Sequence, residues 1–227
     1  MDALLAAIEA ASHDASLRAV VLTGEGNTFV SGGDLRELRE ARTSVDAERL
    51  SDTGRAVCLG LAGLDVPVIA AINGAAIGGG AELAVACDLR IADDRAKVCF
   101  KHARMGLVTS WGTLPRLLSL VGPATAARLL YTAHEVRAME ARALGLVDYV
   151  ADHGASVATA VAWALDIAQG SPLAVAEMKG LLRDAQSAHE HLRARERERF
   201  VATWTSADHQ EAVEAFFESR APKWRGK

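Results

Sequence analysis

Short apolar runs alternate with stretches of helical periodicity along the first part of the chain. The apolar runs are bounded by glycine, proline or charged residues, as buried strands are, and they cover residues 16–24, 66–73, 88–92 and 97–100. Between them, apolar residues recur at helical spacing in residues 35–41, 47–64 and 81–87. Strands that alternate with helices predict an α/β fold with parallel strand pairing.

The pattern changes after residue 111, where helical periodicity becomes almost continuous. Only residues 146–150, LVDYV, have the composition of a further strand. Basic and acidic residues alternate in residues 193–199, which is typical of a solvated helix face with ion pairs one turn apart. We therefore expect an α/β core over residues 1–150 and a helical region over residues 151–227.

Composition narrows the possible functions. The chain has 227 residues, half of them hydrophobic, and a net charge of −4 with acids and bases interspersed. This charge does not favour binding to nucleic acid or to a membrane surface, and no apolar run has transmembrane length. The cysteines Cys58, Cys87 and Cys99 lack CxxC spacing, so we expect buried free thiols and a cytoplasmic protein. The spacing of histidine and cysteine suggests no metal site.

The stretch GAAIGGGAEL, residues 74–83, raises the first chemical question. A helix that begins at Gly79 or Gly80 presents free N–H groups at the positive end of its dipole, where anionic oxygen binds. The phosphate-binding motifs GxxxxGK[ST] and GxGxxG are absent, so a developing oxyanion is the better candidate. A tight strand-to-helix turn is the alternative, and from the residues alone the two are about equally favoured.

A second glycine pair lies in FVSGGDLREL, residues 29–38, again between a strand and a helix. It is a candidate for the second donor that an oxyanion hole requires. Glu82, in the first turn of the other helix, is either a partner of the helix dipole or a general base or acid beside the substrate.

These stretches, in this order and spacing, resemble the crotonase (enoyl-CoA hydratase/isomerase) superfamily. The matching segments include RAVVLTGEGNTFVSGGDLREL, VPVIAAINGAAIGGGAELAVACDLRIA and MGLVTSWGTLPRLLSLVG. The resemblance implies a crotonase-like spiral of ββα units with a C-terminal helical trimerisation region. It also implies an acyl-CoA thioester substrate, a homotrimer or hexamer, and no cofactor apart from the coenzyme A of the substrate.

The resemblance also assigns roles within the site. The amides of Gly33 and Gly79 would hold the thioester oxygen as it becomes an enolate, and Glu82 would transfer the proton. The residues next to the two donors would contact the substrate, and they are Ser31, Gly32, Asp34, Leu35 and Gly78.

The sequence departs from the family pattern at two points in the site. The second glutamate of the hydratases aligns with His102, which is either an assistant in proton transfer or a structural histidine. The acid that some isomerases place after GLVP is replaced by Thr109 and Ser110. The segment HxxMGxxxSWG is closer to decarboxylase-like members of the family, in which Trp111 would wall the acyl pocket rather than only fill the core.

Family members also carry about forty residues, including a β-hairpin, before the segment that opens this chain. Either the start of this chain is misassigned, or the binding site for the adenine end of coenzyme A lacks that hairpin. Three hypotheses follow. The first is a CoA-thioester lyase of the hydratase/isomerase type. The second is a decarboxylase of ethylmalonyl-CoA or methylmalonyl-CoA, and the third is a non-catalytic acyl-CoA-binding subunit.

Overall fold

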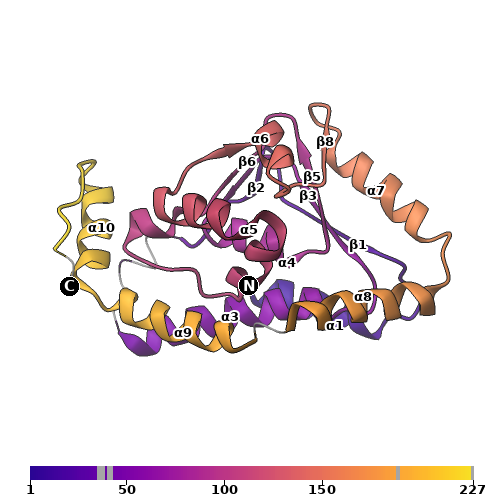
Figure 1. Ribbon diagram of the computed structural model, residues 1–227, viewed down its shortest axis with the longest axis horizontal. Coiled ribbons are helices and arrows are strands. Elements are labelled where there is room, and N and C mark those ends of the chain that lie inside the picture. The colour runs from indigo at the N-terminus through magenta and orange to yellow at the C-terminus, as the bar shows by residue number, and fades with distance from the viewer. Residues whose placement is uncertain (35–38, 40–42, 188–189, 226–227) are drawn as a thin grey trace.

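The strands form two four-stranded sheets. The computed structural model describes residues 1–34, 39, 43–187 and 190–225, and within them the strand order is β1-β3-β5-β8 in one sheet and β2-β4-β6-β7 in the other (Figure 1). The first sheet contains β1 (Val20–Thr23), β3 (Val68–Ile72), β5 (Leu89–Asp93) and β8 (Tyr149–Ala151). The second contains β2 (Thr28–Val30), β4 (Ala75–Ile77), β6 (Lys97–Cys99) and β7 (Val136–Arg137).

Successive strands enter the two sheets alternately, and this gives the chain its spiral. The pairings β1–β3–β5–β8 and β2–β4–β6 are parallel, whereas β6 and β7 pair antiparallel. Helix α3 (Ser44–Gly63) follows the first pair of strands, and α4 (Gly79–Ala86) follows the second. The ββα repeat and the parallel pairing that the sequence predicts are therefore confirmed.

The core lies around β3 and α4. All five residues of β3 are buried, as expected for a central strand of a parallel sheet with both faces covered. Helix α4 is buried from Gly80 to Ala86, so its polar first turn is held deep inside the protein. The cysteines Cys58, Cys87 and Cys99 are buried free thiols, as predicted.

The remaining helices wrap around this core. Helix α1 (Asp2–His13) packs on α3, and α5 (Thr113–Thr132) bends at Gly122, where φ is 72°. Helix α7 (Ser156–Ile167) covers the first sheet, and α9 (Glu190–Trp204) runs beside α3 and α5. The short helix α6 (Ala138–Ala143) and α8 (Pro172–Ser187) complete the set with α10 (Ala207–Phe217). No helix in the described ranges is long and apolar enough to cross a membrane.

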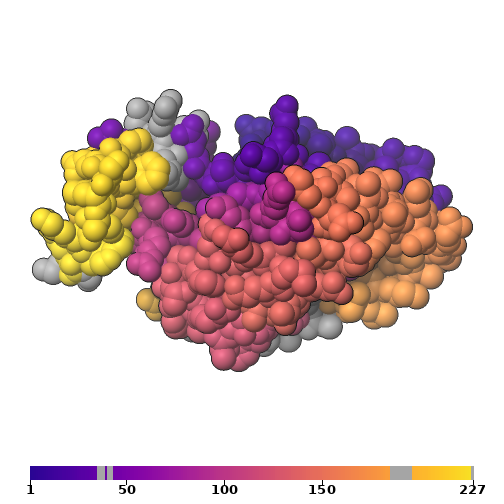
Figure 2. All heavy atoms as spheres, turned by 90° about the horizontal axis from the view of Figure 1, so that it is seen from above, coloured from indigo at the N-terminus to yellow at the C-terminus, as the bar shows by residue number. Residues whose placement is uncertain are grey.

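Helix α10 stands at one end of the molecule, while α7 and α8 stand at the other (Figures 1 and 2). Helix α10 packs against α9 and against η1, the 3-10 helix Lys101–Met105. The regular elements after residue 151 are all helices in the described part of the chain. Of these, α7 packs on the first sheet and α9 packs on α3 and α5, so both contact the α/β core. A boundary at residue 150 stays a prediction.

The sequence missed the shortest elements. Strands β2, β4 and β7 have only two or three residues each, which is too short for a periodicity to register. Val136 was expected to be helical, but it pairs with Val98 of β6. The strand expected at 146–150 begins only at Tyr149, and most of the helix expected at 35–41 lies outside the described residues.

Candidate active site

A cavity of about 710 Å³ opens at the N-terminal end of α4. It contains every predicted site residue except Leu35, which lies outside the described residues. These lining residues are Ser31, Gly32, Gly33, Asp34, Gly78, Gly79, Glu82, His102 and Trp111. The loops after β2 and β4, the η1 helix and the C-terminal helices therefore meet at one place.

Each glycine of the GGG run has a separate structural reason. Gly78 has φ 55°, a left-handed conformation that favours glycine. A Cβ on Gly79 would lie 2.3 Å from the Trp111 ring, and one on Gly80 would lie 2.0 Å from the carbonyl oxygen of Val30. Backbone conformation thus accounts for the first glycine and close packing for the last two, as the tight-turn interpretation expects. Ligand binding by this run stays a prediction.

The two glycine loops adjoin. Gly32 has φ 95°, and a Cβ there would lie 3.0 Å from the carbonyl oxygen of Ile77 and 3.7 Å from the amide nitrogen of Gly79. Gly79 is the first residue of α4, so its N–H has no acceptor within the helix. Gly33, on the neighbouring loop, lines the same cavity. The two predicted donor residues therefore lie on adjoining loops and line one cavity.

Glu82 is 2% exposed and its carboxylate is held by donors on both oxygens. Oε2 accepts hydrogen bonds from the amides of Ser110 at 3.1 Å and Trp111 at 3.0 Å. It also accepts one from the Thr113 hydroxyl at 2.5 Å. Oε1 lies 2.9 Å from Nε2 of His102. Thr109 and Ser110 stand where some isomerases have their acid. The segment that begins with them donates the hydrogen bonds that hold Glu82.

His102 contacts Glu82 from the η1 helix with a side chain that is 11% exposed. A carboxylate only accepts, so the hydrogen of this pair lies on Nε2. Nδ1 is buried and has no hydrogen-bond partner among the described residues. In the neutral ring Nδ1 therefore carries a lone pair that the protein leaves unused. The structure brings Glu82 and His102 together, as a proton-transferring pair requires.

The Trp111 ring fixes the wall of the cavity beside Gly79. A Cβ on Gly54 of α3 would lie 2.0 Å from Trp111 Cε2, and the ring also meets Gly79. Trp111 is thus wedged between two glycines and lines the cavity. It walls the cavity and packs on the core, so both roles considered for it apply.

Sequence reasoning missed Glu196 of α9. It lies in the charged run 193–199, which we expected to be solvated, but Glu196 is 6% exposed. Its Oε1 accepts hydrogen bonds from the Thr109 hydroxyl and from the Leu114 amide. Burial, and next the charge of Glu82, raise the pKa of Glu196 to about 7. No sequence signal separates this glutamate from its neighbours, because only tertiary packing buries it.

The far part of the cavity is apolar. Its walls come from η1, α3, α9 and α10 and from the segment after η1, and the apolar side chains are Leu50, Met105, Leu107, Phe200, Trp204, Phe216 and Phe217. Such a surface suits a hydrocarbon chain, with the polar groups of α4 and η1 at one end of it.

One group of side chains elsewhere has the composition of a metal site. Asp93, Asp94 and His153 place one ligand atom each within 4.8 Å of one another. Asp93 already accepts hydrogen bonds from the amides of Gly154 and Arg95. The group does not line the cavity, and exposed acidic groups of this kind are common without a metal.

Known proteins share both the sequence and the fold. The family model described as enoyl-CoA hydratase/isomerase matches residues 1–227. A probable enoyl-CoA hydratase of Bacillus subtilis is 32% identical over 100% of this chain and 89% of its own length. A short-chain-enoyl-CoA hydratase of Clostridium acetobutylicum is 36% identical over 97% of this chain and 84% of its own.

Solved structures give the same result. EchA1_1 from Mycobacterium paratuberculosis superposes with a TM-score of 0.87 at 32% identity, over 99% of this chain and 87% of its own. Pseudomonas aeruginosa DspI superposes with a TM-score of 0.78 at 36% identity, over 98% of this chain and 85% of its own. The chain therefore belongs to the enoyl-CoA hydratase/isomerase family of enzymes.

Proposed function

We propose that the protein acts on an acyl-CoA thioester, forms or captures its enolate, and moves a proton at the carbon next to the thioester carbonyl. The observation that carries this proposal is the contact between Glu82 and His102 in the cavity that the two glycine loops line. Proton-transferring groups and candidate oxyanion donors thus share one space, which enolate chemistry requires.

The amides of Gly33 and Gly79 hold the thioester oxygen in the proposed reaction. Electrons move onto this oxygen when the enolate forms, and two preorganised N–H donors stabilise that charge. Removing one such donor costs about 3–4 kcal/mol of transition-state stabilisation in comparable sites. No metal or redox chemistry is needed, because the electron pair returns to carbon when the enolate is protonated.

The Glu82–His102 pair moves the protons. For an enoyl-CoA, the pair accepts a proton from water as the water oxygen bonds to the β-carbon, and the enolate then takes a proton at the α-carbon. His102 contacts Glu82 through Nε2, so the ring is placed to pass a proton to or from the carboxylate. In this reading the histidine takes the place of the hydratases' second carboxylate.

Decarboxylation is the second candidate, and the hydrogen bonds of Glu82 favour it. Oε2 is occupied by three donors and Oε1 by His102, so the carboxylate has little capacity left to accept a proton from water. Loss of carbon dioxide from a malonyl-type thioester needs the oxyanion hole but no base, since the C–C bond electrons form the enolate directly.

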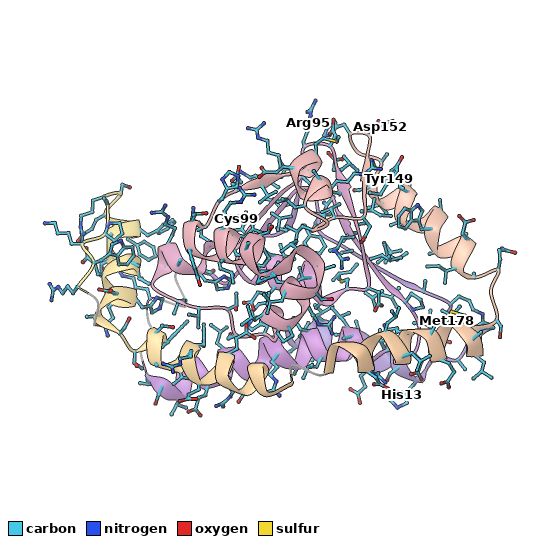
Figure 3. All side chains as sticks on the ribbon, in the orientation of Figure 1. His13, Arg95, Cys99, Tyr149, Asp152 and Met178 are labelled. Atoms are coloured by element: carbon cyan, nitrogen blue, oxygen red, sulfur yellow. The ribbon has the colours of Figure 1, made fainter. Side chains whose placement is uncertain are left out.

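We also propose that the protein assembles as a homotrimer or a hexamer. Support comes from α8, where large apolar side chains are exposed in the single chain, namely Leu173, Met178, Leu181 and Leu182. Met178, which is labelled on α8 in Figure 3, is 61% exposed. Contiguous exposed apolar side chains of this kind are typical of subunit contacts. Light scattering coupled to size-exclusion chromatography gives the mass that tests this proposal.

The test of function is a paired assay of the purified protein with crotonyl-CoA and ethylmalonyl-CoA, read by mass spectrometry. Hydration of crotonyl-CoA supports the first reaction, and release of carbon dioxide from ethylmalonyl-CoA alone supports the second. If both thioesters bind and neither reacts, the catalytic proposal is wrong for these substrates, and a non-catalytic acyl-CoA-binding subunit is favoured.

A further inference from the structure

The 109–114 segment, which runs from the connection after η1 into the first turn of α5, lies between two buried carboxylates. On one side, the Ser110 and Trp111 amides and the Thr113 hydroxyl donate to Glu82. On the other side, the Thr109 hydroxyl and the Leu114 amide donate to Glu196. The Gly112 backbone also contributes a hydrogen bond to Glu196. The donors to the two carboxylates therefore interleave along the segment.

The surroundings of Glu196 suit the neutral acid. Oε2 is buried and has no hydrogen-bond partner among the described residues. Burying an oxygen of an ionised carboxylate without a hydrogen-bond partner has a high desolvation cost. A second negative charge close to Glu82 adds to that cost, because like charges interact strongly in a water-poor interior.

We infer that Glu196 is a positioning residue that anchors the 109–114 segment and thereby fixes the Glu82 carboxylate. In its neutral form it does so without a second negative charge beside Glu82. The inference rests on the proposed function only for its effect on catalysis. Glu196 does not line the cavity, so it acts through the segment and not by touching the substrate. Its helix, α9, thus ties the C-terminal region to the site.

Among the charged groups around Glu196, Glu82 has the largest effect on its pKa. From α3, Glu48 and Asp52 pair with Arg197 of α9 instead. Also on α3, Arg55 has a buried Nε without a hydrogen-bond partner among the described residues. Arg116 of α5 donates to the carbonyl of Ala86, and His209 of α10 stacks on Trp204. After burial, the charge of Glu82 is the largest cause of the raised pKa of Glu196.

The first test measures stability and needs no substrate. The pKa of Glu196 rises from 4.5 to about 7 on folding, so between these values the unfolded chain releases a proton that the folded protein keeps. The contribution of this group to stability therefore falls as pH rises from about 4.5 to 7 and is constant above that. Glu196→Gln removes this pH-dependent contribution. We therefore expect the urea midpoint of Glu196→Gln to rise relative to that of wild type as pH increases from about 4.5 to 7.

The matched control is Glu198→Gln, which changes an exposed glutamate two residues further along α9. Its midpoint is expected to follow wild type at every pH. In a Glu82→Gln background, the gain of Glu196→Gln should end at a lower pH, because the repelling charge is gone. A difference between Glu196→Gln and wild type that does not vary with pH overturns the neutral-acid assignment, whatever the substrate is.

The second test measures turnover of the thioester that the paired assay identifies. If ionisation of Glu196 disturbs Glu82, kcat of wild type should fall above pH 7, and Glu196→Gln, which cannot ionise, should not show this fall. Glu196→Ala, which removes the acceptor contacts, lowers kcat roughly tenfold to a hundredfold with little change in KM. A wild-type kcat in Glu196→Ala contradicts the positioning role, and equal pH profiles for wild type and Glu196→Gln contradict an effect of the Glu196 charge on Glu82. If wild type turns over no thioester, the proposed function fails and the stability test alone decides the state of Glu196.

Discussion

Nε2 of His102 lies 2.9 Å from Oε1 of Glu82, and this contact joins the first turn of α4 to the η1 helix across 20 positions of sequence. Both side chains line the cavity beside the two glycine loops. The pair combines a group that only accepts hydrogen bonds, when ionised, with one that can donate at one nitrogen and accept at the other. Chemistry at this site should therefore depend on both residues and not on Glu82 alone.

Replacing Glu82 by glutamine should reduce kcat at least about a hundredfold, the lower end of the effect of a general acid–base group. The amide keeps one acceptor for the donors of the 109–114 segment, so binding of the thioester should persist. Steady-state kinetics gives kcat, and isothermal titration calorimetry gives the dissociation constant. Glu9→Gln, on the exposed face of α1, is the control. Unchanged turnover in Glu82→Gln removes this residue from the mechanism.

The Trp111 ring should be sensitive to a methyl group on α3. Gly54→Ala places a Cβ 2.0 Å from Trp111 Cε2, so the ring must shift from its place beside Gly79. We expect a loss of about 1–3 kcal/mol in the free energy of unfolding, as for other overpacked sites, and a fall in kcat. Intrinsic tryptophan fluorescence reports the displaced ring.

The control for this change is Gly63→Ala in the same helix. A Cβ at Gly63 meets nothing within 4 Å, so alanine should stabilise the helix by about 0.5–1 kcal/mol and leave kcat unchanged. Equal kcat values for Gly54→Ala and wild type show that the position of Trp111 does not matter for the reaction.

Lys179 should be a main attachment of α8 to the α/β core. Nζ lies 2.8 Å from Oδ2 of Asp88 and also donates to the carbonyls of Leu61 and Val66. Lys179→Met keeps the length of the side chain but leaves these buried acceptors without their donor. We expect a loss of about 3 kcal/mol in the free energy of unfolding, measured with urea. Arg49→Met, at an exposed position, should change it by less than about 0.5 kcal/mol.

Acid should weaken the packing of α10 on η1 through His209. Burial lowers the pKa of His209 below 6.5, so as pH falls through 6.5 the unfolded chain takes up a proton before the folded protein does. The contribution of this group to stability is thus lost toward acidic pH. His209→Gln should lose less stability between pH 7 and pH 5 than wild type, by urea unfolding.

His13→Gln is the control for the acid experiment, because His13 lies on the outer surface at the end of α1 (Figure 3). It should follow wild type over the whole pH range. If His209→Gln and wild type lose stability in parallel, protonation of His209 is not what weakens the fold in acid.

The strongly patterned parts of the fold were predictable from the sequence. The run VIAAI and the amphipathic stretch from residue 47 to residue 64 carry their own signals, and both form the predicted elements at β3 and α3. Strand β4 was not predictable, because its three residues Ala75–Ile77 lie inside the glycine-rich stretch. Its identity depends on pairing with β2 and β6, which no local pattern records.

The candidate site was predictable only in part for a similar reason. Glycine runs and Glu82 stand out in the sequence, and the family resemblance pointed to His102. Glu196 did not stand out, because its burial depends on packing against α3 and α5. The sequence also did not show why position 79 needs glycine for packing, because only the structure places the Trp111 ring against it.

The central claim is that the protein generates an enolate and that this enolate takes a proton at the α-carbon. The most direct measurement is turnover of crotonyl-CoA and ethylmalonyl-CoA in deuterium oxide, with the position of deuterium in the product read by NMR and mass spectrometry. Deuterium at carbon 2 of the product of either thioester, lost in Glu82→Gln, is the predicted result. Thioesters that bind but return unreacted, with no deuterium at carbon 2, would contradict the account.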